Sequence, residues 1–123
     1  MSGAPSSRQQ RVGDLLRAEI SEIVRIRMRD PRLGFLTVTE VEVSRDLRHA
    51  SVFVSVLGKE KEGSTALGIL NKASGFVRSE LGSRVELKHT PELRFKIDRS
   101  LERSMRISAV LKKILDEPPR EGS

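Results

Sequence analysis

The sequence contains no cysteine, tryptophan or tyrosine, and aromatic residues make up only 3% of its 123 residues. Without cysteine, neither a disulfide framework nor a thiolate metal site can form. The scarcity of aromatic rings counts against a domain that reads RNA bases mainly by stacking, such as the RRM. No apolar run approaches the roughly 18 residues of a membrane span, and the start of the chain lacks a signal-peptide hydrophobic region. We therefore expect a cytoplasmic protein that binds no membrane.

Residues suited to catalysis are also scarce. His49 and His89 are the only histidines, and no motif places either one beside a nucleophile. No glycine-rich phosphate loop is present, which disfavours nucleotide hydrolysis. Asp30, Glu40 and Glu42 could bind a cation, but carboxylates on one face of a strand are usually solvated. The sequence predicts a protein that is not an enzyme and that uses no cofactor or metal.

Positive charge, by contrast, is abundant. The chain has 23 Lys and Arg against 17 Asp and Glu, which gives a formal net charge of +6 and a pI near 10.3. This balance favours an anionic partner, most simply nucleic acid, although a soluble protein with solvated basic faces would have the same composition. A chain of this length is expected to form one domain with a modest core, and we expect a monomer.

Apolar periodicity predicts the order helix, strand, strand, broken helix, strand, helix. The strands are expected at residues 35–44, 50–56 and 93–97, and the first two should form an antiparallel hairpin. A sheet of three strands has one apolar face to bury, and the predicted helices can pack against that face. We therefore predict an α+β fold in two layers.

The expected helix starts rest on capping patterns. Ser7 followed by Gln10 fits a capping box for the first helix, and Ser64 is a candidate N-cap for the helix after the hairpin. Pro31 disfavours helical geometry at Asp30, so the first helix should stop there.

The first strand changes its apolar phase. Leu36 and Val38 would share one face of a regular strand, whereas Val41 and Val43 would share the other. A bulge, a strong twist or partial burial of both faces near Thr39–Glu40 would explain the change.

The stretch at residues 70–81 predicts a helix interrupted by a glycine. Leu70, Ala73, Val77 and Leu81 recur at helical spacing on both sides of Gly75. An interior glycine costs about 1 kcal/mol relative to alanine. It either kinks the helix or lets another group approach the backbone closely.

Four local strings carry a family resemblance: DPRLG at 30–34, VEVSRDL at 41–47, LNKASGFVR at 70–78 and TPELRF at 90–95. Each string alone is weak, but their order and spacing together are specific. From about residue 8 to residue 115, the chain resembles ribosome-binding factor A, a family of small bacterial factors for assembly of the small ribosomal subunit.

The resemblance implies a type II KH-like domain, in which two core helices meet at an Ala-x-Gly kink. Here the kink matches Ala73, Ser74 and Gly75. Ordinary KH domains instead carry a GXXG loop that clamps nucleotides, and no two glycines of this sequence have that spacing. The expected organisation is a disordered tail at 1–6, the KH-like domain at 7–98, an amphipathic helix at 99–116 and a disordered tail at 117–123.

The resemblance also implies a function in ribosome biogenesis. The family binds the free small (30S) subunit and its 16S ribosomal RNA, supports late maturation and processing of the 5′ end of that RNA, and supports growth in the cold. The alternative that the sequence leaves open is a basic protein-interaction module, recruited to RNA only through a protein partner.

The candidate RNA-binding residues lie around the kink and the hairpin turn: Arg45, Arg48, Lys72, Ser74, Gly75, Arg78, Arg84 and Lys88. At Gly75 a phosphate would meet no β-carbon, although close helix packing or the kink itself would equally explain the glycine. Phe53, on the polar face of the second strand, could stack on a base or be covered by a neighbouring segment.

The last predicted helix carries apolar residues at helical spacing. It is expected either to dock on the domain through this stripe or to stay mobile until it meets the ribosome. The stripe consists of Ile107, Val110, Leu111 and Ile114.

Overall fold

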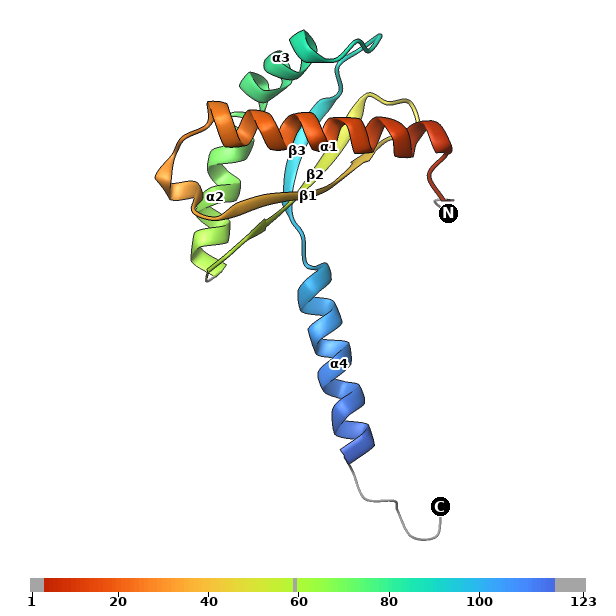
Figure 1. The fold of residues 1–123 in the computed structure, drawn as a ribbon, viewed down its shortest axis with the longest axis vertical. Coiled ribbons are helices and arrows are strands. Elements are labelled where there is room, and N and C mark those ends of the chain that lie inside the picture. The colour runs from red at the N-terminus through yellow and green to blue at the C-terminus, as the bar shows by residue number, and fades with distance from the viewer. Residues whose placement is uncertain (1–3, 59, 117–123) are drawn as a thin grey trace.

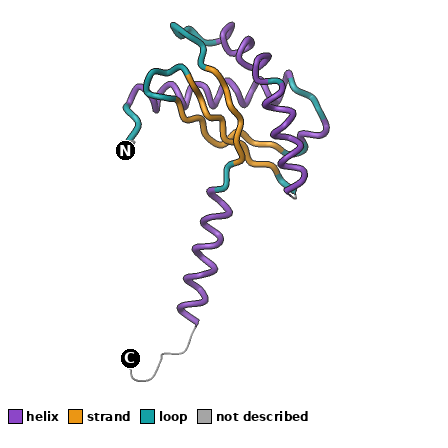
Figure 2. Tube along the Cα trace, turned by 180° about the vertical axis from the view of Figure 1, so that it is seen from behind, coloured by secondary structure: helices purple, strands orange, loops and turns teal. Residues whose placement is uncertain are grey.

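The computed structural model shows a three-stranded sheet with three helices against one face, and a fourth helix that extends away from it (Figures 1 and 2). It describes residues 4–58 and 60–116. The predicted tail at 117–123 and the first three residues of the predicted N-terminal tail lie outside the described residues. The elements are α1 (Ser7–Arg27), the 3-10 helix η1 (Pro31–Leu33), β1 (Leu36–Val43), β2 (His49–Val56), α2 (Glu60–Lys72), α3 (Ser74–Arg84), β3 (Glu92–Ile97) and α4 (Ser100–Asp116).

The sheet has the order β1-β2-β3. Strands β1 and β2 form the predicted antiparallel hairpin, and β3 returns beside β2 in the parallel direction after the two helices α2 and α3. This confirms the α+β class, the three strands and the cover of helices. Figure 2 shows the molecule from the opposite side. Glu40, Glu42, Arg94 and Lys96 are exposed and alternate with the buried residues of their strands, so they lie on the sheet face opposite the helices.

A bulge in β1 resolves the change of apolar phase. Val38 lies opposite Val54, and Glu40 lies opposite Phe53, so that Thr39 is the extra residue. One extra residue shifts the side-chain alternation by one position. As a result Val38, Val41 and Val43 are all buried in the same core. The bulge, one of the explanations predicted for this strand, is therefore confirmed.

The core combines that strand face with one stripe from each covering helix. Leu16 and Ile20 of α1, Leu70 of α2 and Val77 of α3 are fully buried, as is Val52 of β2. Burial of an aliphatic side chain of this size contributes about 1.5–3 kcal/mol. No buried polar or charged residue is found in the described part of the chain, so the core is held together by apolar packing.

Helix α1 crosses the outer edge of β1 at very short range. A β-carbon built on Gly13 would lie 2.5 Å from the carbonyl oxygen of Val41, which real β-carbons do not tolerate. One turn earlier, the Nε2 group of Gln9 donates a hydrogen bond to the carbonyl of Val43 at 3.1 Å. Together these contacts cover the second half of the β1 edge.

Two predicted helix starts are wrong. The capping box is Ser6 with Gln9, one residue before the predicted Ser7 and Gln10. Helix α2 begins at Glu60, so Ser64 lies inside the helix and is not its N-cap. The helix continues through Gly63, where a β-carbon would meet only the end of the Ile97 side chain.

Asp98 joins β3 to α4. Its carboxylate accepts hydrogen bonds from the amide and hydroxyl of Ser100, and from the hydroxyl of the bulge residue Thr39 at 2.7 Å. Helix α4 leaves the domain from this joint and extends away from it (Figure 1). Ile107 and Leu111 are 61% and 53% exposed, so the predicted stripe does not dock on the domain in this structure.

We predict that Gly13→Ala destabilises the protein by about 1–3 kcal/mol, because the new methyl group must push α1 away from the Val41 carbonyl. Urea unfolding would measure the free energy. Gly68→Ala is the matched control: Gly68 lies within α2, and its β-carbon would meet nothing within 4 Å. Alanine there should stabilise the protein by up to about 1 kcal/mol. Equal stability of Gly13→Ala and wild type would contradict the close contact.

A second prediction concerns acid. Hydrogen bonds from Ser100 and then Thr39 hold the pKa of Asp98 below its ordinary 3.8. A lowered pKa in the folded state stabilises the protein above the ordinary pKa, and this contribution is lost as pH falls through the folded-state value. The stability difference between wild type and Asp98→Asn should therefore be present at neutral pH and shrink in acid.

An NMR titration of the Asp98 carboxyl carbon tests this directly. We expect a midpoint below 3.8, which Thr39→Val and Ser100→Ala should each raise. A midpoint at or above 3.8 in the wild type would show that these hydrogen bonds do not persist in solution.

Candidate RNA-binding surface

The break between α2 and α3 lies at Ala73, two residues before Gly75. Ala73 has φ −92° and ψ 6°, and α3 starts immediately after it at Ser74. Gly75 has no positive φ. A β-carbon on Gly75 would meet nothing within 4 Å. Thus neither the backbone conformation nor close packing against any described residue requires glycine at position 75.

Asn71 fixes the break against the sheet. Its amide oxygen accepts a hydrogen bond from the Phe95 N–H at 2.8 Å, and its amide nitrogen donates to the Phe95 carbonyl at 3.1 Å. These backbone groups lie on the outer edge of β3, opposite β2. The Asn71 side chain therefore covers this part of the β3 edge and holds the neighbouring residues Lys72 and Ser74 beside it. The sequence reasoning missed Asn71, because its partner lies 24 residues away.

Two shallow hollows flank the break. One, of about 470 Å³, brings Arg32 of η1 beside Lys72 and Ala73, and its floor includes the bare backbone of Gly68. The other, of about 430 Å³, places Ser74 and Asn71 beside the starts of β2 and β3. Arg32 was also missed, since only the fold places η1 against α2.

Arg78 has a structural role as well as a charge. Its Nε and Nη2 groups donate hydrogen bonds to the Thr90 carbonyl at 3.1 and 2.9 Å, which ties α3 to the loop before β3. Lys88 is exposed in that loop. Arg78 and Lys88 therefore belong to the same end of the domain.

Arg84 is less available to an RNA phosphate than the sequence alone suggests. Its Nη1 group lies 3.8 Å from a carboxylate oxygen of Glu19 and 3.9 Å from one of Glu22, both on α1. The guanidinium thus bridges α3 and α1. Any contact with phosphate would compete with two carboxylates.

The hairpin turn presents Arg45 and Arg48 on an ordered loop. Asp46 accepts hydrogen bonds from the Ser44 hydroxyl at 2.6 Å and the Arg48 amide at 3.1 Å, and Leu47 has a positive φ of 61°. The Arg48 carbonyl accepts a hydrogen bond from the amide of Glu92, which lines the same hollow as Ser74. The end of the turn therefore borders the hollow that contains Ser74.

Phe53 is half-buried on the sheet face opposite the helices. The Thr39 hydroxyl, which donates to Asp98, also lies 3.2 Å from the Phe53 carbonyl oxygen. Phe53 therefore lies on another side of the sheet from the helix break.

Sites of other kinds are not found in the described residues. Within residues 4–58 and 60–116, no three His, Cys, Asp or Glu side chains gather closely enough to hold a metal ion. Among the helices of the same residues, none is long and apolar enough to cross a bilayer.

Comparisons with known proteins agree with the fold. The family model described as ribosome-binding factor A matches residues 8–111. A ribosome-binding factor A from Halothermothrix orenii is 51% identical over 110 residues, which cover 89% of this chain and 90% of the relative.

A crystal structure and a homology model fitted into a cryo-EM map are similar in three dimensions. The crystal structure of ribosome-binding factor A from Thermus thermophilus is 29% identical with a TM-score of 0.67, over 75% of this chain and 98% of that one. A homology model of the Thermus thermophilus factor, fitted into the cryo-EM map of its 30S complex, is 31% identical with a TM-score of 0.61. That match covers 71% of this chain and 91% of the other. The sheet and helices are thus those of the KH-like fold, with Ala-x-Gly in place of GXXG.

We predict that Asn71→Ala destabilises the protein by about 1–3 kcal/mol, because it leaves the Phe95 N–H and C=O without their partner. Lys72→Ala, at the next position and exposed, should change stability by less than about 0.5 kcal/mol. Thermal and urea unfolding of the two variants would show the difference. Similar, small effects for both would mean that Asn71 does not hold the break in place.

Proposed function

This chain belongs to the ribosome-binding factor A family, and on that basis we propose that it is an assembly factor that binds the small (30S) ribosomal subunit. The observation that carries the proposal is its similarity to the Thermus thermophilus factor fitted into a 30S complex. Its work on the ribosome would place the protein in the cytoplasm.

We further propose that the chain contacts 16S ribosomal RNA with the surface around the α2–α3 break. Lys72 and Lys88 are exposed and have no ion pair among the described residues, so their charge is available to phosphate. Phosphate contacts of this kind supply much of the affinity for RNA and make it decrease with salt. Arg45 and Arg48 extend the basic surface along the hairpin turn.

Gly75 supports the proposal that RNA contacts the surface around the break. Gly75 is exposed, and among the described residues nothing lies within 4 Å of the position that a β-carbon would take. A backbone phosphate of the RNA could approach the helix there without meeting a β-carbon. The glycine would then serve binding and not folding.

No chemical step is needed for such a factor. It would bind one conformation of the ribosomal RNA more tightly than another and hold it until maturation is complete, since differential affinity is sufficient to shift an equilibrium. Under this proposal the protein acts as a monomer without a cofactor, in late maturation and processing of the 5′ end of 16S ribosomal RNA, and most critically in the cold.

Sedimentation with isolated 30S subunits, 50S subunits and 70S ribosomes across a salt series tests the proposal. We expect the protein to sediment with 30S subunits alone. Lys72→Glu with Lys88→Glu should weaken binding by tenfold or more and reduce the slope of log affinity against log salt by about one for each lost contact. Arg78 is left unchanged, because it also holds the Thr90 loop.

The matched control is Lys61→Glu with Arg17→Glu, which changes the net charge equally at exposed positions away from the break. It should bind nearly as the wild type does. Gly75→Ala, which keeps the charge, should be folded and yet weaken binding. Equal binding to 30S subunits, 50S subunits and 70S ribosomes would mean that the interaction is only nonspecific electrostatic attraction. Binding that is insensitive to salt would favour the alternative of recruitment through a protein partner.

A further inference from the structure

Among the described residues, this chain covers parts of both outer edges of the sheet. Asn71 occupies the edge of β3 at Phe95. Gln9 and the close approach of Gly13 cover β1 at Val43 and Val41. The α1 contacts of this kind lie at Val41 and Val43, and none is found among the described residues for the stretch from Leu36 to Val38.

The backbone of this stretch points outward at two residues. The Phe35 carbonyl accepts a hydrogen bond from Leu57 of the neighbouring strand segment at 3.0 Å, and pairing alternates from there along an antiparallel ladder. The N–H and C=O groups of Leu36 and Val38 therefore face away from β2. Within the part of the chain that the structure describes, no group hydrogen-bonds to them. Unpaired groups of this kind are a template for another strand.

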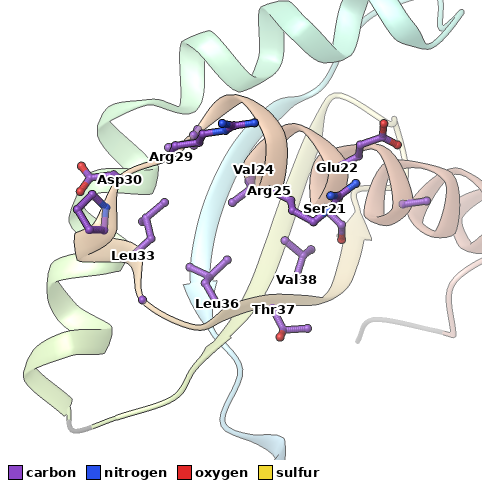
Figure 3. Close-up of a pocket in the computed structure, with 14 residues that line it drawn as sticks. Ser21, Glu22, Val24, Arg25, Arg29, Asp30, Leu33, Leu36, Thr37 and Val38 are labelled. Atoms are coloured by element: carbon purple, nitrogen blue, oxygen red, sulfur yellow. The ribbon is translucent and has the colours of Figure 1, made fainter.

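A cleft of about 720 Å³ opens beside this edge. Figure 3 shows Val24 of α1, Leu33 of η1, and Leu36 and Val38 of β1 around one space, with Arg25 and Arg29 above it. Its volume lies in the range of roughly 300–1,000 Å³ that is typical of binding pockets. The cleft thus offers apolar side chains directly beside free strand groups.

Two carboxylates, those of Glu22 and Asp30, line the cleft together with Arg25 and Arg29. The carboxylate of Asp30 is held by Arg32 at 2.6 Å, and that of Glu22 lies 3.9 Å from Arg84. Among the described residues, no ion pair joins Arg25 or Arg29 to a carboxylate. Within the described residues, the two guanidinium groups are therefore not engaged by a carboxylate and can pair with carboxylates of a ligand whose apolar side chains enter the cleft.

We propose that the edge of β1 at Leu36–Val38 is a docking site for an extended acidic segment of a protein partner, which adds a strand to the sheet. Its backbone would pair with Leu36 and Val38, alternate apolar side chains would enter the cleft, and its carboxylates would meet Arg25 and Arg29. RNA fits less well, because it cannot continue a peptide ladder. Helix η1 separates this cleft from the hollow at Lys72, so this inference does not rest on the proposed function.

The test uses the isotope-labelled full chain and a capped hexapeptide of alternating valine and glutamate as probe. NMR titration should shift the amides of Leu36 and Val38, and hydrogen exchange at these two N–H groups should slow. The same peptide with lysine in place of glutamate should bind about tenfold more weakly. Arg25→Glu with Arg29→Glu should reverse this preference, whereas Arg11→Glu with Arg17→Glu, on the same helix outside the cleft, should not.

Leu36→Pro provides an independent measurement. Proline is tolerated at the first residue of an edge strand whose N–H faces outward, so the variant should fold. The substitution removes one N–H donor from the edge of β1 and should lower the affinity for the peptide about tenfold. Equal binding of both peptides, or shifts confined to other residues, would overturn the proposal. A short uridine oligoribonucleotide that displaces the peptide and shifts the same amides would also overturn the proposal. That result would assign the cleft to RNA.

Discussion

The contact between Gly13 and the Val41 carbonyl determines how the largest covering helix lies on the sheet. Because no side chain intervenes, α1 can cross the edge of β1 at backbone distance and bury Leu16 and Ile20 against the strands. The bulge at Thr39 is the counterpart of this contact. It turns Val38, Val41 and Val43 to one face, so a single apolar layer meets the helix. The same crossing leaves the first half of β1 open, since a straight helix cannot follow a twisted strand along its whole length.

Two polar side chains then determine where the α2–α3 break and the start of α4 lie. Asn71 bonds both backbone groups of Phe95 and so positions the α2–α3 break at the edge of the sheet. Asp98 bonds Thr39 and Ser100, and so joins the bulge to the start of α4. Both lie at the ends of elements, where apolar packing no longer fixes the direction of the chain. A few hydrogen bonds of ordinary strength, about 1 kcal/mol each, are sufficient because the core already supplies the stability.

Much of the fold was predictable from apolar spacing, and the failures have identifiable causes. The bulge could be expected because the valines of β1 change phase on either side of Thr39. The capping box was misplaced because Ser6 with Gln9 and Ser7 with Gln10 satisfy the same local pattern, and only tertiary packing chooses between them. The predicted start of α2 at Ser64 is too late, because glycine is a poor helix former and Gly63 therefore suggests a turn. In the structure Gly63 lies in the first turns of α2.

The candidate surface was harder to predict than the fold, since it depends on residues that are distant in sequence. The string around Gly75 marked the break, but nothing local indicates that Arg32 lies beside Lys72 or that Glu19 and Glu22 approach Arg84. Spacing also cannot separate a glycine that permits close packing from one that leaves space. Gly13 and Gly75 look alike in sequence, yet a β-carbon would strike backbone at Gly13 and would meet nothing at Gly75. The first glycine is explained by folding. The second has no such explanation among the described residues, and the proposed contact with an RNA phosphate would supply one.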